Sequence, residues 1–408
     1  MNALPEFVIV GGGLAAGKAA EALRTQGFTG RIILVGDENH RPYLRPPLSK
    51  DYLQGKADRD SVLVHPDDWY DEHDVELLLG NEAIALDRTE RRVRLSDGSD
   101  VAYDRLLLAT GSSPRLLSIP GADLTGVHYL RRIEDCEAIK AAFGQVSRVV
   151  IVGAGWIGLE TAAAARAAGL EVTVLESADL PLVQILGAQV GKVFADLHTE
   201  HGVDLRLGVQ VESFSGNDGL VTTVHLKDGT SIATGMVIVG VGITPNVALA
   251  ESAGIEVDNG IVVDEHLRTS DPDVFAAGDV ANAYNPRLGR RIRVEHWANA
   301  VNQPAVAAAG MLGRDEVYDR LPYFYSDQYD LGMEYTGYAD PDSYDEVVFR
   351  GDVKARTFIA FWLAEGRVLA GMNVNIWDVT DDIKALIESG RSVDLVRLAD
   401  TSIPLADL

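Results

Sequence analysis

The sequence has little cysteine and no long apolar run. Cys136 is the one cysteine among 408 residues, which excludes an internal disulfide and a C-x-x-C redox pair. No apolar stretch reaches the roughly 20 residues that a membrane-spanning helix needs. The first expected strand begins at Phe7, so no basic and apolar signal region fits before it. We therefore expect a cytoplasmic protein.

Basic residues are also scarce. Lys and Arg number 36 against 61 Asp and Glu, which gives a formal net charge of −25. This acidity argues against general binding to nucleic acids or anionic membranes. The remaining composition, 47% hydrophobic with 40 glycines, is typical of an α/β protein, and 408 residues suffice for two or three domains.

A glycine-rich loop near the N-terminus is the feature around which the chain is organised. It follows an apolar strand at residues 7–10 and precedes a run of helix-forming residues, in the pattern G-x-G-x-x-A. Gly11 permits the tight turn, Gly13 lets the backbone approach a pyrophosphate, and Ala16 allows close packing of helix on strand. Alone, the motif also fits a plain glycine turn between core elements. The next strand, residues 31–36, ends in Asp37 and Glu38, where a carboxylate meets the ribose hydroxyls of a dinucleotide.

The same device appears a second time. A strand at residues 149–152 leads into Gly153, Gly155 and Gly158, and the strand at 171–175 ends in Glu176. A carboxylate there accepts bonds from the ribose 2′-hydroxyl of NADH and repels the 2′-phosphate of NADPH, and residues 177–184 contain no Lys or Arg. Two fingerprints predict FAD at the first loop and NADH at the second, positioned for hydride transfer.

Between the loops, three prolines make residues 42–47 a rigid segment that leads into a helix beginning near Pro47 or Leu48. Lys50 is then a candidate to offset negative charge on a reduced flavin, although a solvated lysine at a helix start is the alternative. Glu160, two residues after Gly158 on the second helix, is its candidate partner. Arg131 or Arg132 is a candidate to reach the flavin, or a surface charge.

Two later segments carry candidate functions. Asp279 follows Gly278 at the end of an apolar strand, where it is placed either to bind a ribityl chain or to cap the next helix. Residues 287–293 hold four arginines, Arg287, Arg290, Arg291 and Arg293. This basic patch is either a steering surface for an acidic partner or a solvated loop. Beyond it, residues 347–351, 356–363 and 367–375 predict three antiparallel strands, with a helix near 381–389.

Taken together, these motifs identify a family resemblance. The two fingerprints, the R-P-P-L-S-K loop at 45–50, Ala109-Thr110-Gly111, Gly278-Asp279 and the aromatic stretch at 323–328 resemble the FAD-dependent, NADH-using ferredoxin reductases that serve bacterial cytochrome monooxygenases and aromatic-ring dioxygenases. The resemblance implies a glutathione-reductase-like α/β flavoprotein with two dinucleotide-binding domains and a C-terminal α+β domain. The implied boundaries are 1–114 and 243–322 for FAD, 115–242 for NAD and 323–408 for the C-terminal domain.

The resemblance also implies site residues. Ala15, Asp37, Lys50, Arg131, Asp279 and Trp297 fall at FAD-contacting positions of the family, and Lys50 with Glu160 would form the charged pair near flavin and nicotinamide. The FAD candidates are Gly11, Gly13, Leu14, Ala15, Ala16, Asp37, Glu38, Arg45, Lys50, Ala83, Ala109, Thr110, Gly111, Arg131, Gly278, Asp279 and Trp297. The NAD candidates are Gly153, Gly155, Ile157, Gly158, Glu160, Glu176 and Gly242, and no metal ligands are expected.

The predicted reaction moves a hydride from NADH to FAD and then electrons to a [2Fe–2S] ferredoxin. The ferredoxin is expected near the four arginines of 287–293 and near Tyr323 and Tyr325, where a member of the family has tryptophans. Core or rim tyrosines are the alternative at both positions. A disulfide reductase or an oxidase on this fold needs a redox cysteine near the flavin, and Pro46, Pro47 and Leu48 occupy that loop. A rubredoxin reductase, or a slow redox-signalling flavoprotein resembling apoptosis-inducing factor, stays open.

Overall fold

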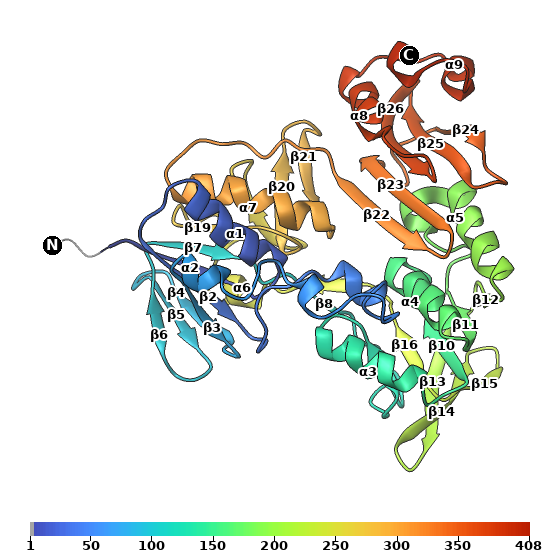
Figure 1. Ribbon diagram of the computed structural model, residues 1–408, viewed down its shortest axis with the longest axis horizontal. Helices are drawn as coiled ribbons and strands as arrows, with labels where there is room; N and C mark the ends of the chain where they lie inside the picture. The colour runs from blue at the N-terminus through green and yellow to red at the C-terminus, as the bar shows by residue number, and fades with distance from the viewer. Residues whose placement is uncertain (1–3) are drawn as a thin grey trace. The chain divides into compact units, whose positions relative to one another are not determined.

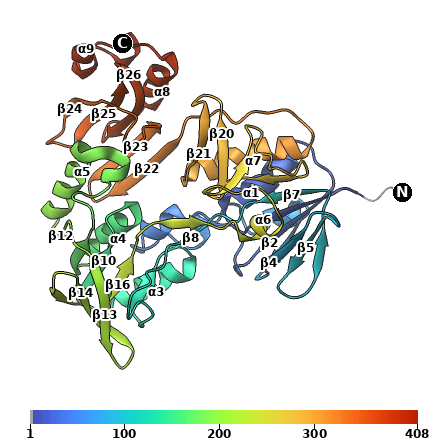
Figure 2. The same ribbon diagram turned by 180° about the vertical axis from the view of Figure 1, so that it is seen from behind.

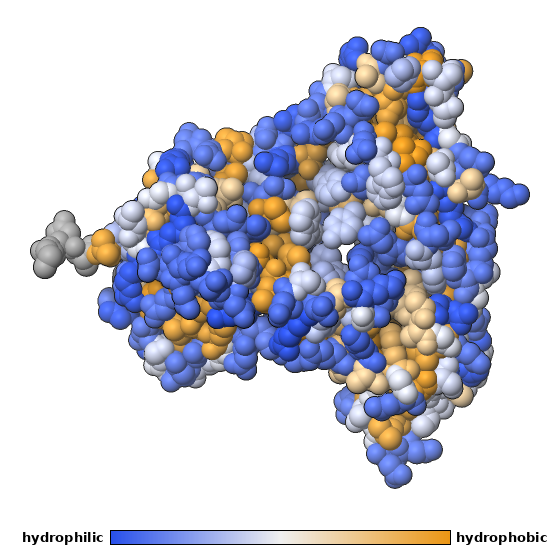
Figure 3. Space-filling model, in the orientation of Figure 1, coloured by the Kyte–Doolittle hydropathy of each residue, from blue (hydrophilic) through white to orange (hydrophobic). Residues whose placement is uncertain are grey.

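The computed structural model describes residues 4–408, which divide into two compact units. Unit 1 contains the described residues up to Pro46 together with Asp58–Ser113 and Ile243–Pro322, and unit 2 contains Pro47–Ala57, Pro114–Gly242 and Tyr323–Leu408. The visible face is mostly hydrophilic (Figure 3), as expected for a net charge of −25.

Unit 1 is built on a five-stranded parallel sheet. The elements of unit 1 are β1 (Glu6–Val10), α1 (Leu14–Thr25), β2 (Arg31–Gly36), η2 (Asp60–Val62), α2 (Trp69–Glu72), β3 (Val75–Leu79), β4 (Ala83–Asp87), β5 (Arg92–Leu95), β6 (Asp100–Ala102), β7 (Arg105–Leu108), α6 (Ala248–Ser252), β18 (Ile261–Val263), β19 (Val274–Ala276), β20 (Ala281–Asn285), β21 (Arg290–Arg293) and α7 (Trp297–Met311). The sheet order is β19-β7-β1-β2-β3, and α1 and α7 pack together beside it (Figure 1). Val8 and Ile9 of the central strand are fully buried, as expected for a strand covered on both faces.

Two further sheets complete unit 1: one is antiparallel, and the other is mixed, because β18 pairs in parallel with β20 and β20 pairs antiparallel with β21. The expected hairpin at Asp97-Gly98 is confirmed, because β5 pairs with β6 on either side of it in the sheet β4-β5-β6. The other sheet has the order β18-β20-β21, and β8 (Ser112–Pro114) and β17 (Ile243–Pro245) form a two-stranded pair. The alternative that Asp279 caps a helix is wrong, since the element that follows it is the strand β20.

Unit 2 contains the second parallel sheet and two antiparallel sheets. The elements are η1 (Pro46–Ser49), β9 (Val127–Tyr129), α3 (Ile133–Phe143), β10 (Arg148–Val152), α4 (Trp156–Ala167), β11 (Glu171–Leu175), α5 (Val183–Glu200), β12 (Asp204–Arg206), β13 (Val211–Asn217), β14 (Leu220–Leu226), β15 (Ser231–Ala233), β16 (Val237–Val239), β22 (Tyr323–Gln328), β23 (Leu331–Gly337), β24 (Glu346–Asp352), β25 (Thr357–Ala364), β26 (Arg367–Val374), α8 (Thr380–Ser389), α9 (Leu395–Ala399) and η3 (Leu405–Asp407). The parallel sheet has the order β12-β11-β10-β16-β9, and β13-β14-β15 is an antiparallel layer.

The C-terminal antiparallel sheet of unit 2 has more strands than the sequence predicts. The three predicted strands are confirmed as β24, β25 and β26, and α8 packs on the sheet (Figure 2). Two strands that the sequence did not reveal, β22 and β23, extend it to the order β22-β23-β26-β25-β24. On β22 the side chains alternate between buried Phe324, Ser326 and Gln328 and outward Tyr323 and Tyr325. The buried face of β22 therefore carries polar as well as apolar side chains, so the strand does not show the alternation of apolar and polar residues that would predict it from the sequence.

Candidate functional site

The first glycine loop has the geometry of a dinucleotide cradle. Gly11 has φ of 133°, and a Cβ there would lie 2.1 Å from the carbonyl oxygen of Ala109, so this backbone contact admits only glycine. A Cβ at Gly13 would meet nothing within 4 Å, which leaves open space in front of the loop. Gly13 is also the N-cap of α1 and gives it no side-chain cap, so N–H groups of the first turn are left for an anion. Leu14, Ala15 and Ala16 form the buried first turn.

The two carboxylates after β2 have different environments. Glu38 is buried and accepts hydrogen bonds from the Tyr43 hydroxyl and from Arg45, whose Nη2 lies 2.7 Å from Oε1. Asp37 is exposed. Asp37 is therefore the more accessible of the two carboxylates, whereas Glu38 fixes Arg45 beside the Tyr43 ring, 5.1 Å from its centroid.

The other flavin candidates of unit 1 lie at the ends of β7 and β19 and at the start of two further elements. Ala109 and Thr110 follow β7, and Thr110 Oγ1 donates to the carbonyl of Asn246 at 2.8 Å. Gly111 has φ of 64°. A Cβ at Gly278, which follows β19, would lie 3.1 Å from the Cβ of Ala15, so Gly278 and Asp279 lie beside the first turn of α1. Ala83 begins β4, and Trp297 begins α7 with 38% of its surface exposed.

The second glycine loop repeats the geometry of the first. A Cβ at Gly153 would lie 2.3 Å from the carbonyl oxygen of Gly240, and one at Gly158 would lie 2.0 Å from that of Gly153. Gly155 and Gly242 face open space. Ile157, in the first turn of α4, is 39% exposed, which is unusual for isoleucine beside a core strand. Each of the two loops thus has a closed side against a strand and an open side in front.

Glu176 lies across the second loop. Its carboxylate accepts hydrogen bonds from the backbone N–H of Ala154 at 2.6 Å and of Ala178 at 2.9 Å. These bonds hold the carboxylate at the end of β11. Oε1 also accepts from Ser177 Oγ at 3.1 Å, and Oε2 keeps a lone pair for a further donor such as a ribose hydroxyl.

Lys50 and Glu160 form a buried ion pair inside unit 2. Lys50 Nζ lies 2.7 Å from Glu160 Oε2, and the side chains are 14% and 4% exposed. The same oxygen accepts from the Ser49 hydroxyl, and Oε1 accepts from Ser326 Oγ at 2.7 Å. The helix expected to begin near Pro47 or Leu48 is only a single 3₁₀ turn, η1, followed by turns at residues 50–55. Lys50 Nζ also lies 5.7 Å from the centroid of the Tyr325 ring.

Arg131 and Cys136 lie around the start of α3. The backbone N–H of Arg131 donates to the carboxylate of Asp135 at 3.0 Å. Cys136 is fully buried on α3 and donates its thiol to the carbonyl of Leu48 at 3.1 Å. Burial raises the pKa of this thiol to about 12, so it is not a reactive thiolate at neutral pH.

The basic segment is a strand hairpin rather than a free loop. Arg287 bonds Asp319 at 2.9 Å, Arg291 donates to the carbonyl of Val263, and Arg293 pairs with Glu295. Arg287, Arg290 and Arg291 are nevertheless exposed. Tyr323, on β22, donates to Glu334 at 2.7 Å. These contacts fix the side chains of Arg287, Arg291, Arg293 and Tyr323, each within its own unit.

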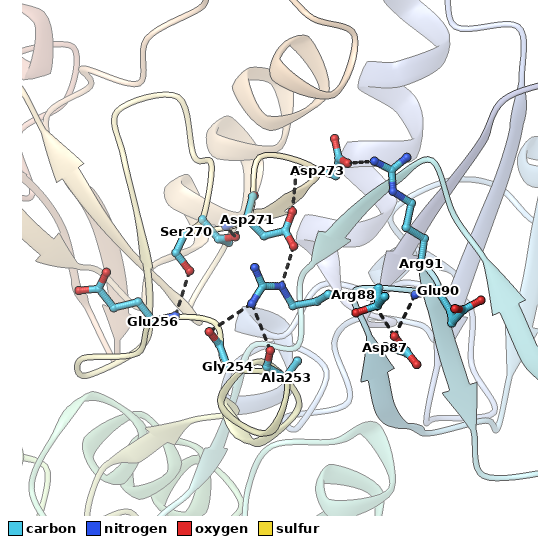
Figure 4. Close-up of polar contacts among 12 residues, drawn as sticks. Asp87, Arg88, Glu90, Arg91, Ala253, Gly254, Glu256, Ser270, Asp271 and Asp273 are labelled. Atoms are coloured by element: carbon cyan, nitrogen blue, oxygen red, sulfur yellow. Dashed lines mark hydrogen bonds and ion pairs between the residues drawn. The ribbon is translucent and has the colours of Figure 1, made fainter.

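A surface hollow of about 770 Å³ lies in unit 1, lined by β4 residues and by Arg88, Ser252, Ala253 and Asp271. Figure 4 shows Arg88 reaching across to Asp271, to which its Nε donates at 2.6 Å, and to the carbonyls of Ala253 and Gly254. Arg88 therefore ties the β4-β5-β6 sheet to α6, and neither glycine loop contributes to the lining. We assign this hollow to structure rather than to nucleotide binding.

The described part of the chain contains neither a cluster of metal ligands nor a membrane-spanning helix. Within residues 4–408, no group of three or more His, Cys, Asp and Glu side chains is placed to hold a metal ion. Over the same residues, no helix is long and apolar enough to cross a bilayer. The residues present do fit two dinucleotides, since each glycine loop offers open space, an uncapped helix and a carboxylate at the end of the adjacent strand.

Three comparisons agree with this geometry. Residues 5–304 match the family model described as pyridine nucleotide-disulphide oxidoreductase, and residues 323–408 match the one described as reductase C-terminal. The chain is 42% identical to rhodocoxin reductase of Rhodococcus erythropolis, over 90% of this chain and 86% of that protein. It is 39% identical to putidaredoxin reductase of Pseudomonas putida, over 100% and 97%. A crystal structure of the covalent putidaredoxin reductase–putidaredoxin complex superposes with a TM-score of 0.95, at 39% identity, over 100% of this chain and 98% of that one.

Proposed function

The chain belongs to the pyridine nucleotide-disulphide oxidoreductase family and to the ferredoxin reductases within it, and from that premise we propose that it carries electrons from NADH through FAD to a [2Fe–2S] ferredoxin that supplies an oxygenase. The observation that carries the proposal is the pair of glycine loops, each closed against a strand and open in front. FAD, when bound, accepts a hydride and releases its electrons one at a time. The protein supplies binding, orientation and charge.

We assign the residues as follows. The loop at Gly11 and Gly13 and the N-terminus of α1 bind the pyrophosphate of FAD, and Asp37 binds its ribose. The loop at Gly153 and Gly155 and Glu176 bind NADH in the same way. Lys50 stabilises negative charge on the reduced flavin, and Glu160 holds Lys50 in place. The proposed domains are 1–114 and 243–322 for FAD, 115–242 for NADH and 323–408 at the C-terminus.

The state of Cys136 supports a chemistry that does not use a thiol. Cys136 is buried and protonated, so the disulfide route used by other enzymes of this fold has no residue to carry it. NADH as the electron source and a lone unpaired cysteine also favour the cytoplasm as the place of action.

Anaerobic titration with NADH tests the proposal. We expect full bleaching of the flavin absorbance at one NADH per FAD, and persistent oxidised flavin would contradict it.

Replacement of Glu176 by glutamine should weaken the preference for NADH over NADPH by about tenfold, or about 1.4 kcal/mol. Glutamine removes the charge that repels a 2′-phosphate, and its one amide oxygen can accept from the N–H of Ala154 or of Ala178 but not from both. The measurement is kcat/KM for each coenzyme. Glu171→Gln, an exposed carboxylate at the start of the same strand, is the control. A preference unchanged by Glu176→Gln would exclude Glu176 from the ribose site.

The Arg290→Glu replacement should slow ferredoxin reduction by about fivefold at low salt, with the difference fading as ionic strength rises. Arg290 is chosen because it is an exposed residue at the start of β21. Reduction of the flavin by NADH should stay at the wild-type rate. The Arg92→Glu variant makes the same charge change on exposed β5 and should leave ferredoxin reduction unchanged. Equal salt dependence for all three proteins would remove the arginine segment from the docking surface.

A further inference from the structure

A chain of buried polar side chains leads away from Glu160 inside unit 2. Gln328 Nε2 lies 3.1 Å from Ser326 Oγ, and Gln328 Oε1 lies 2.8 Å from Nε2 of His198 on α5. The hydroxyl of Tyr329 lies 3.3 Å from Nδ1 of the same histidine. Ser326, Gln328 and His198 are each at most 1% exposed. Such a continuous buried series requires every group to be satisfied.

The direction of every hydrogen bond in this chain follows from its end at Glu160. As the carboxylate partner of Lys50, Glu160 only accepts, so the Ser326 hydroxyl donates to it. Ser326 Oγ is then the acceptor for the amide N–H₂ of Gln328, which leaves the amide oxygen of Gln328 facing His198. His198 must therefore carry its proton on Nε2, and Nδ1 accepts from Tyr329. All donors point toward Glu160.

His198 can fill this role only as a neutral ring. Burial lowers its pKa to about 4, with a smaller contribution from the nearby His201. His201 stacks on Tyr329 with the ring centroids 3.8 Å apart, at the turn between β22 and β23. At neutral pH the histidine therefore serves as a fixed donor rather than as a proton carrier.

We propose that Ser326, Gln328 and His198 are positioning residues that lock the carboxylate of Glu160 and thereby place Lys50 for hydride transfer. The inference rests on the function proposed above. Ser49 and Lys50 share Oε2 of Glu160, so the Ser326 bond is what stops the carboxylate from turning. Asp327, on the outward face of β22, is close enough to interact with both Lys50 and Glu160, and Asp51 and Glu334 lie near Asp327, so other carboxylates compete for Lys50 once Glu160 can turn.

The first test determines the direction of these hydrogen bonds and does not depend on enzyme turnover. Nitrogen-15 NMR of FAD-loaded protein labelled at its nine histidines reports the tautomer of each ring, and His198→Gln assigns the signal of His198. We expect a neutral ring protonated on Nε2 that stays neutral down to about pH 5, above the lowered pKa of about 4. A ring protonated on Nδ1, or charged at pH 7, would overturn the proposal whatever the protein reduces.

The second test measures flavin reduction by NADH in rapid mixing. Ser326→Ala should lower the limiting rate about tenfold, corresponding to about 1.4 kcal/mol of barrier, while the apparent Kd for NADH stays unchanged. Ser326→Thr, which keeps the hydroxyl, should restore the rate, and Ser389→Ala on α8 should match the wild type. If Ser326→Ala lowers thermal stability but not the limiting rate, the chain is only structural. Absence of flavin reduction in the wild type would instead refute the proposed function.

Discussion

The Lys50→Met protein should lose about 3–5 kcal/mol of unfolding free energy in unit 2 and should accept hydride from NADH about 100-fold more slowly. The stability loss follows from burial, because the change leaves the carboxylate of Glu160, 4% exposed, without its cation. The rate loss follows from removing the positive charge that stabilises the reduced flavin. The two effects have different causes and are therefore separable.

The double variant Lys50→Met with Glu160→Gln separates them. A neutral amide no longer needs a cation. Its oxygen can accept from one of the hydroxyls of Ser49 and Ser326 and its N–H₂ can donate to the other, so most of the unfolding free energy should return. Flavin reduction should stay slow. Chemical denaturation followed by near-ultraviolet circular dichroism gives the stability, and rapid mixing gives the rate. Lys192→Met, which breaks an exposed pair with Asp196, should cost less than about 1 kcal/mol. Wild-type flavin reduction in the double variant would make the pair purely structural.

Gly13→Ala should weaken FAD binding about 100-fold, or about 2.7 kcal/mol, without destabilising the apoprotein. The new Cβ meets no protein atom within 4 Å, so it intrudes only on the space that we assign to the pyrophosphate. Gly11→Ala should lose FAD and stability together, because its Cβ would lie 2.1 Å from the carbonyl oxygen of Ala109 and force β1 and β7 apart.

The measurement is FAD content and affinity by fluorescence, beside the thermal midpoint of each apoprotein. Gly98→Ala is the matched control, since it has a positive φ of 88° and open space but lies in the β5–β6 turn. It should keep its FAD, and any loss of stability there measures backbone strain alone. Wild-type FAD affinity in Gly13→Ala would refute the assignment of the first loop.

The sequence predicts well what local chemistry determines. Both strand–glycine–helix units were predictable because φ values near 100° and contacts to a neighbouring backbone leave only glycine at Gly11 and Gly153. Asp37 and Glu176 were predictable as candidates because each directly follows a strand of its parallel sheet. The roles assigned to these residues remain predictions, since the geometry supports them without a bound nucleotide.

Long-range pairings were not predictable from the sequence. The strand β22 lacks a hydrophobic period of two because its buried face carries Ser326 and Gln328, whose partners lie far along the chain on α4 and α5. Glu38 could not be distinguished from Asp37 until Arg45 and Tyr43 were seen to enclose it. The pair of Lys50 and Glu160 is the exception, since the sequence predicts this pairing and the structure shows the ion pair at 2.7 Å.

The most direct measurement is electron delivery to a [2Fe–2S] ferredoxin by the FAD-loaded protein, with NADH and NADPH compared and the flavin and iron–sulfur absorbances followed together. We predict rapid reduction of the iron–sulfur centre, two ferredoxins for each NADH, with strong preference for NADH. Rapid flavin bleaching with no electrons reaching the ferredoxin would contradict the reductase function and favour an oxidase or a redox-signalling role. A rubredoxin reduced faster than the ferredoxin would assign the enzyme a different partner.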